Sequence, residues 1–122
     1  MLMDILLISP RPDAWAECAP VFAEHGANLQ TAADLHVGMD AVRRQNPALV
    51  ILDLGLPADE LRKAVIGILQ VNAMIHTAAV SAMSETEFHD IMEGLGMLMG
   101  LSDPPSVDGA RRLMAALSAV QG

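Results

Sequence analysis

The sequence predicts an α/β fold, an open and doubly wound sheet of five parallel strands with helices on both faces. Short, almost continuously apolar runs recur along the chain, and the segments between them carry apolar residues at helical spacing. Runs without in–out alternation are typical of strands that are covered on both faces, as in a parallel sheet. Five such strand–helix units in 122 residues are too few to close an eight-stranded barrel, so we expect an open sheet.

Five apolar runs are predicted as strands. They are residues 5–8, 28–32, 48–52, 74–80 and 97–101, of which 28–32 is the least apolar. The stretch 64–82 has no charged residue and is long enough to suggest a membrane span. Polar side chains inside it, Gln70 and Asn72 among them, argue against a membrane segment and indicate the end of a helix followed by a buried strand.

The first two helices are predicted from apolar spacing and from their end signals. Trp15 and Phe22 lie on one face of the first helical segment. Because Pro20 cannot donate a backbone hydrogen bond, we expect this helix to be kinked or broken. Asp34 is the predicted N-cap of the second helix, which ends before Pro47.

The remaining helices follow the other strands. The third is predicted from an apolar stripe over residues 61–68. Ser84 and Glu87 form the capping box of the fourth, and Gly94 or Gly96 is expected to end it. The fifth is expected to begin near the Pro-Pro pair that follows the last strand.

Composition and charge exclude several classes of function. A mean hydropathy of +0.38 excludes intrinsic disorder, and the length suits one domain, residues 1–122. Fifteen acidic against seven basic residues give a formal charge of -8, so nucleic acid is not an expected partner. Cys18 is the single cysteine, so no disulfide forms within the chain. The N-terminus lacks the basic region of a signal peptide, and we expect a cytoplasmic protein without a membrane segment.

In this topology, of flavodoxin type, the strand order is 2-1-3-4-5 and the functional crevice lies at the carboxyl ends of strands one and three. The residues expected to line it are Ser9, Pro10, Asp53, Gly55, Ser81 and the segment 100–103. Asp53 is the most informative of them, because it follows a buried apolar run. It is either a cap for a loop or helix, or a chemical acceptor or metal ligand.

The segment 49–57, Leu-Val-Ile-Leu-Asp-Leu-Gly-Leu-Pro, resembles the phosphoacceptor segment of bacterial response-regulator receiver domains. The segment 79–82, Ala-Val-Ser-Ala, resembles the switch segment after their fourth strand. The resemblance spans nearly the whole chain in the order of its five units. It implies a two-component phosphorelay, with Asp53 as the residue phosphorylated by a sensor histidine kinase, Ser81 as the hydroxyl that contacts the phosphoryl group, and magnesium as the metal.

Three departures from the receiver pattern concern the phosphorylation chemistry. The two acidic residues that hold magnesium after strand one are replaced by Ser9 and Pro10, which leaves Asp53 as a lone ligand of an incomplete metal site. The lysine after strand five is replaced by Gly100 or Leu101, and Arg11 is the nearest candidate cation. The aromatic switch residue is also absent, because the chain has no tyrosine.

We therefore expect a degenerate receiver that acts by protein–protein contact with a histidine kinase or another signalling protein, and no enzyme. One alternative is a true phosphoacceptor, phosphorylated on Asp53. Another is a small flavodoxin-like ligand-binding domain or enzyme, whose pocket would be lined by Ser9, Asp53 and Ser81.

The fourth helix and fifth strand suggest a contact surface. Four methionines gather there in the sequence: Met83, Met92, Met97 and Met99. If exposed, they would form a soft apolar surface for a homodimer or a partner. No DNA-binding or catalytic module follows Gly122 in this sequence, so we expect any signal to leave through a surface, unless the chain is part of a longer protein.

Overall fold

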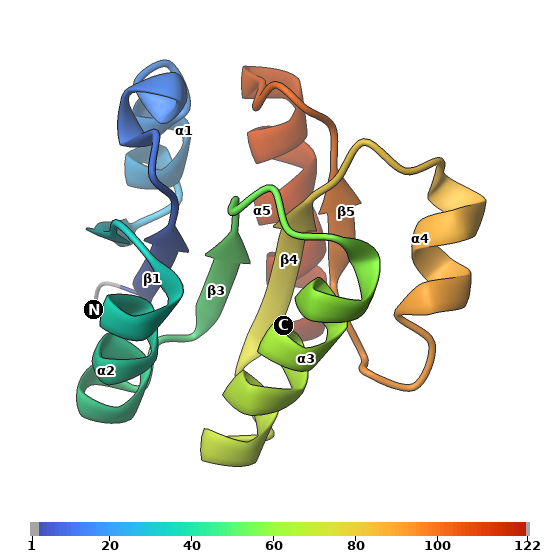
Figure 1. Cartoon of the computed structure of the whole chain (residues 1–122). Coiled ribbons are helices and arrows are strands. Elements are labelled where there is room, and N and C mark those ends of the chain that lie inside the picture. The colour runs from blue at the N-terminus through green and yellow to red at the C-terminus, as the bar shows by residue number, and fades with distance from the viewer. Residues whose placement is uncertain (1–2, 122) are drawn as a thin grey trace.

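The strands form a single parallel sheet in a computed structural model of the chain, which describes residues 3–121. The strand order is β2-β1-β3-β4-β5, and every neighbouring pair is parallel. The strands are β1 Met3–Ile8, β2 Ala27–Ala32, β3 Leu49–Leu52, β4 His76–Val80 and β5 Met99–Leu101. The predicted doubly wound, five-stranded fold of flavodoxin type is confirmed (Figure 1).

Helices cover both faces of the sheet and divide the core into two layers. They are η1 Pro12–Trp15, a short 3₁₀ helix, α1 Ala19–Glu24, α2 Leu35–Gln45, α3 Ala58–Val71, α4 Glu85–Ile91 and α5 Val107–Gln121. One core lies between the sheet and the side of α1 and α5, and the other lies under α2, α3 and α4. No helix within residues 3–121 is both long enough and apolar enough to cross a membrane.

The first helical segment is broken, as Pro20 predicts. The 3₁₀ helix η1 ends at Trp15, and α1 begins at Ala19 with Pro20 in its first turn, where a missing N–H costs nothing. The second helix is capped as predicted, since an Asp34 side-chain oxygen accepts a hydrogen bond of 2.9 Å from the Val37 N–H.

Helix α4 starts at the predicted capping residue but ends earlier than predicted. The Ser84 hydroxyl oxygen accepts the Glu87 N–H at 3.2 Å, whereas the helix ends at Ile91 and not at Gly94 or Gly96. Arg62 of α3 donates to the carbonyl oxygens of Ile91 at 2.6 Å and Glu93 at 3.1 Å. Terminal carbonyls that a helix leaves unpaired are thus satisfied by a neighbouring helix, and no glycine cap is needed.

Gly38 lets α2 approach strand β1 closely. A Cβ atom placed on Gly38 would lie 2.7 Å from Cγ1 of Ile8 and would also collide with its Cδ1. Ile8 is fully buried in β1, and its branched side chain has little rotamer freedom. The close contact of α2 with β1 therefore depends on the missing side chain.

We predict that Gly38→Ala lowers the free energy of unfolding by about 1 kcal/mol or more, because the overpacking exceeds the gain in helix propensity. Gly67→Ala in α3 is the matched control, since a Cβ there meets no atom closer than the Met39 Cε at 3.9 Å. This control is expected to stabilise the protein by up to about 1 kcal/mol. Urea unfolding of both variants measures the difference, and equal stabilisation by both would contradict the packing argument.

Candidate functional site

The ends of the two central strands bring the first site residues together. Ile8 of β1 pairs with Leu52 of β3, so the residues that follow, Ser9 and Asp53, emerge side by side. The Asp53 N–H donates to the Ile8 carbonyl oxygen at 2.9 Å. Both side chains are nearly inaccessible, with 1% of Ser9 and 3% of Asp53 exposed. A carboxylate is therefore held at the crevice end of the sheet, as predicted from the apolar run before it.

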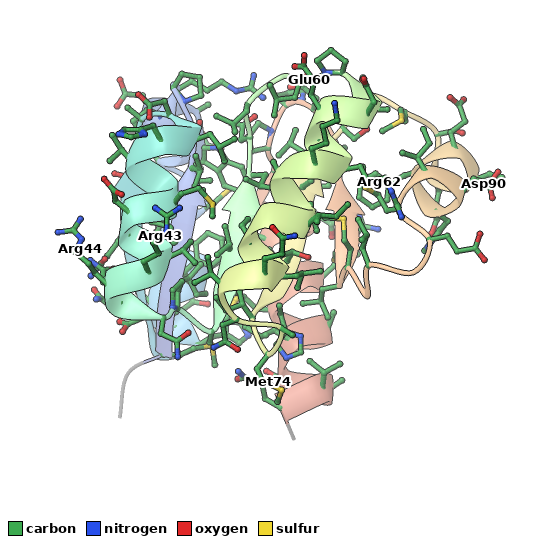
Figure 2. All side chains as sticks on the ribbon, turned by 60° about the horizontal axis from the view of Figure 1, so that its bottom comes forward. Arg43, Arg44, Glu60, Arg62, Met74 and Asp90 are labelled. Carbon is green, nitrogen blue, oxygen red and sulfur yellow. The ribbon has the colours of Figure 1, made fainter. Side chains whose placement is uncertain are left out.

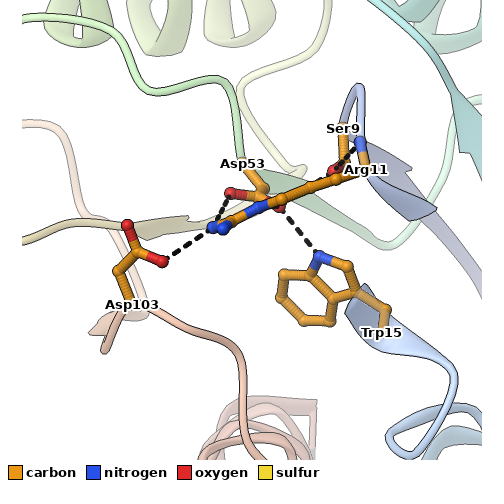
Figure 3. Close-up of polar contacts among 5 residues, drawn as sticks. All are labelled: Ser9, Arg11, Trp15, Asp53 and Asp103. Carbon is orange, nitrogen blue, oxygen red and sulfur yellow. Dashed lines mark hydrogen bonds and ion pairs between the residues drawn. The ribbon is translucent and has the colours of Figure 1, made fainter. Parts of the chain in front are cut away.

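Four hydrogen bonds converge on the Asp53 carboxylate (Figure 3). The Ser9 hydroxyl donates to Oδ2 at 2.8 Å, and the Trp15 indole N–H donates to the same oxygen at 2.9 Å. Arg11 binds both oxygens, Nε to Oδ2 at 2.9 Å and Nη2 to Oδ1 at 2.8 Å. Such a bidentate contact of a guanidinium with a carboxylate is a strong, charge-assisted hydrogen-bond arrangement.

The donors leave the Asp53 carboxylate little capacity for anything else. An ionised carboxyl group has about four acceptor positions, and it receives four hydrogen bonds here. An oxygen that attacks phosphorus or binds a metal ion needs a free lone pair. Three of the four hydrogen bonds fall on Oδ2, so this oxygen has no free lone pair unless a donor leaves. Oδ1 keeps one lone pair, beside the Arg11 guanidinium that donates to it.

Arg11 also ties Asp53 to the loop after β5. Its Nη2 donates to Asp103 at 2.9 Å, so a single guanidinium joins two carboxylates from distant parts of the chain. These hydrogen bonds, to Asp53 first and then to Asp103, raise the pKa of Arg11 and keep it charged. The Arg11 side chain is 41% exposed and that of Asp103 is 45% exposed, so water weakens the outer pair more than the inner one.

The pKa of Asp53 reflects two opposed effects. Burial raises the pKa, because it disfavours the charged form of the carboxyl group. The hydrogen bonds from Arg11, Trp15 and Ser9, in that order, lower it, and so does the positive charge of Arg11. Together the donors outweigh burial, and the pKa of Asp53 lies below its usual value.

The other predicted crevice residues surround a hollow beside Asp53. Pro10, Gly55 and Ser81 line this space of about 490 Å³ together with Asp53, and much of the remaining wall is apolar. The Ser81 hydroxyl oxygen accepts the Met83 N–H at 3.0 Å and makes no hydrogen bond to Asp53. Ser9 does not line the hollow, because its side chain is turned under Arg11, where its oxygen accepts the Arg11 N–H at 3.0 Å.

Part of the predicted methionine contact surface is exposed. Met92 is 4% exposed and belongs to the core, and Met83, Met97 and Met99 are half-buried. A hollow of about 580 Å³ lies between α4 and β5, with Met83, Met99 and Phe88 among the residues that line it. Met83 and Met99 thus lie in an indentation of the surface.

Comparisons with known proteins give matches at the level of structure. No protein-family model and no curated protein matches this sequence. A CheY-like receiver domain protein from Methanospirillum hungatei superposes with a TM-score of 0.79 at 15% identity, over 99% of this chain and 98% of that one. The receiver domain of a LuxO repressor protein from Vibrio parahaemolyticus, described as putative, gives 0.81 at 16% identity, over 99% and 94%.

A two-component response regulator from Clostridium difficile gives a TM-score of 0.78 at 15% identity, over 98% of this chain and 99% of that one. The chain has the fold of response-regulator receiver domains. At this level of identity the likeness concerns the backbone and extends over the full length of both chains. This likeness does not assign roles to the site residues, which follow from their own contacts.

The site does not fit the magnesium ion that the receiver pattern implies. Magnesium prefers six oxygen ligands, with carboxylates among them, and the neighbours of Asp53 are a hydroxyl, an indole and a guanidinium. The described residues hold no group of three or more His, Cys, Asp or Glu side chains arranged to bind a metal. A cation is nevertheless present beside Asp53, and it is the guanidinium of Arg11.

Gly100, one of the two positions that the sequence aligns with the receiver lysine, is closed by packing. A Cβ atom on Gly100 would lie 3.1–3.2 Å from three ring atoms of Phe88. A longer side chain at this position would therefore have to displace the ring, which is buried in the core under α4. The space that a longer side chain at Gly100 would need is thus taken by the Phe88 ring.

Sequence reasoning misses one member of the site and leaves the partners of two others open. It places Trp15 on the apolar face of a helix. It expects Asp103 at the crevice, as part of the segment 100–103, and gives Arg11 as the nearest cation, but it assigns no partner to either. One signal in the sequence points to these partners. The acidic pair and the lysine of the receiver pattern are absent, and a buried carboxylate without a metal ion or lysine needs other hydrogen-bond donors.

We predict that the Asp53 carboxyl titrates below about 3.9, the usual aspartate pKa, in a carbon-detected NMR titration. Trp15→Phe removes one donor and should move the pKa of Asp53 upward.

Because the pKa of Asp53 is lower in the folded than in the unfolded protein, Asp53 stabilises the fold fully above about pH 4, and this contribution is lost as pH falls through the pKa of the folded state. The difference in unfolding free energy between wild type and Asp53→Asn should shrink over that range, and a difference that is constant with pH would contradict the assignment.

Proposed function

We propose that this chain is a receiver-like signalling domain of a bacterial two-component pathway that works by protein–protein contact, without phosphorylation of Asp53. The observation that carries the proposal is the internal pairing of the Asp53 carboxylate. Oδ2 accepts three hydrogen bonds, from Ser9, Arg11 and Trp15, and Oδ1 accepts one more from Arg11. The domain is a binding module and not an enzyme, and it acts in the cytoplasm.

The chemistry of phosphoryl transfer supports this proposal. Such reactions are catalysed by positioning the reactants and by neutralising charge on the transferring oxygens. Here the positive charge of Arg11 is paired with Asp53 and Asp103, and its guanidinium makes a bidentate contact with the Asp53 carboxylate (Figure 3). The same contact joins the loop after β1 to the loop after β5. Arg11 thus holds the crevice in one arrangement without a phosphoryl group.

A sensor histidine kinase or another signalling protein is the proposed partner. The hollow between α4 and β5 offers apolar walls with charged Glu85 and Arg112 among its lining residues, which suits a partner side chain better than a flat surface does. A second copy bound at this same face is the alternative that the sequence suggested.

Two alternative functions, phosphorylation and small-molecule binding, can each be tested. Phosphorylation of Asp53 requires Arg11 to withdraw, and the exposure of the Arg11 side chain, 41%, leaves room for that movement. A small-molecule ligand would occupy the hollow of about 490 Å³ that Asp53 and Ser81 line, and native mass spectrometry of the purified protein would detect it. Ser9, which lies outside the hollow, would not contact such a ligand.

The deciding experiment is an amide NMR titration with magnesium, followed by beryllofluoride, an analogue of the phosphoryl group. We expect no saturable shifts at Asp53 or Ser81 up to millimolar magnesium, because the Asp53 carboxylate is already paired with the Arg11 guanidinium and its Oδ2 accepts three hydrogen bonds. Asp53→Asn is the matched control. Saturable shifts in the wild type that vanish in this variant would establish the phosphoacceptor function and refute the proposal.

A further inference from the structure

A third hollow, of about 410 Å³, lies between α4 and the segment that leads into β5. Three of the nine methionines of the chain line this hollow, namely Met92, Met97 and Met99. The imidazole-bearing residue His89 lines it as well. Thioether and imidazole groups are ligands of soft metal ions, and four of them therefore border one space.

The connection from α4 to β5 brings these methionines together. Met92 directly follows α4, and Met97 and Met99 lie where the chain enters β5. Between them, Gly94 and Gly96 have φ values of +85° and +64°, in the left-handed region that glycine adopts without strain. The chain turns back toward β5 through this connection (Figure 1). Side chains from both ends of the connection therefore line the same hollow.

The filling of core gaps, the usual role of methionine, explains only part of this arrangement. Met92 has that role, since it is 4% exposed and belongs to the core under α4. Met97 and Met99 are half-buried instead, and the space that all three border stays open. Gap filling does not account for three thioethers around an open hollow.

The charges around the hollow favour a cation. Asp90 and Glu93 line it, and no Lys or Arg of the described residues does. Arg62 reaches the same end of α4 from α3, where it is held by the carbonyl oxygens of Ile91 and Glu93 (Figure 2). Because no three His, Cys, Asp or Glu side chains within residues 3–121 are arranged to hold a metal, a hard divalent ion finds no oxygen ligand set here.

We propose that this hollow binds one soft monovalent metal ion, copper(I). Its ligands are the imidazole of His89 and the thioether sulfurs of Met92, Met97 and Met99. Thioethers select copper(I) over the hard ions magnesium and calcium, which prefer oxygen. The rotatable bonds of methionine let the sulfurs turn toward a common point without a shift of the backbone. The His89 side chain is 73% exposed and its contact with Glu85 is long, at 4.0 Å, so the imidazole is available at the rim.

A bound ion would join α4 to the start of β5. His89 and Met99 also line the neighbouring hollow of about 580 Å³, so ligation would alter the walls of the surface that we assign to a partner protein. That consequence rests on the proposed function, whereas the binding of the ion does not. The two proposals are therefore tested separately.

The binding is tested with silver(I), a soft monovalent ion that is stable in air, in methyl NMR spectra of the wild-type protein labelled with ¹³C at its methionine methyl groups. We expect the signals of Met92, Met97 and Met99 to shift together and to saturate at one equivalent, and the His89 ring signals to follow. Met74 is the internal reference, because it is 82% exposed and lies in the loop between α3 and β4 (Figure 2). Magnesium should leave all four methyl signals unchanged.

Variants identify the ligands. Met97→Leu and Met99→Leu each remove a thioether at nearly constant volume, so the fold is retained. Each should weaken silver(I) binding about tenfold or more, as should His89→Ala. Met74→Leu is the matched control, the same replacement outside the hollow, and should leave the affinity unchanged.

Three results would overturn the proposal. The first is the absence of a saturable shift at the three methionines of the hollow. The second is silver(I) binding confined to the Cys18 thiol or to Met74. The third is a methyl shift that magnesium produces equally, because it would assign the site to the carboxylates of Asp90 and Glu93 and not to the thioethers.

Discussion

A carboxylate buried at the end of a parallel sheet requires hydrogen-bond donors, and the donors of Asp53 organise the whole carboxyl edge of this molecule. Ser9 comes from the end of β1, Arg11 from the following loop, and Trp15 from η1. Asp103, in the loop after β5, accepts a hydrogen bond from Nη2 of the same guanidinium. The two ion pairs of Arg11 thus connect the ends of β1 and β3 with the loop after β5.

The break in the first helical segment separates a residue of the site from residues of the core. A continuous helix from Pro12 would have to absorb Pro20 in its interior, at the cost of a hydrogen bond and a steric clash. The break separates η1, which carries Trp15, from α1, whose apolar residues Val21 and Phe22 enter the core. One short segment of sequence therefore supplies both a donor to the site and a covering layer for the sheet.

The fold could be predicted from the sequence to a much greater extent than the site. Apolar runs without alternation identified all five strands, and Asp34, Ser84 and Pro20 marked helix boundaries, because these signals act over a few residues. The end of α4 escaped prediction since it depends on Arg62, a residue of another helix. The donors of Asp53 escaped for the same reason. Their roles depend on the direction of side chains separated by about forty positions, such as Trp15 and Asp53, and no local pattern records that direction.

The location of Trp15 gives the site a natural optical reporter. It is the single tryptophan of the chain, and there is no tyrosine, so the intrinsic near-ultraviolet fluorescence above the weak phenylalanine signal arises at one indole. That indole donates its N–H to the Asp53 carboxylate from a position that is 3% exposed. Its emission is therefore set by the charge and hydration of the crevice, and a rearrangement of Arg11 changes the colour of the light that the unlabelled protein emits.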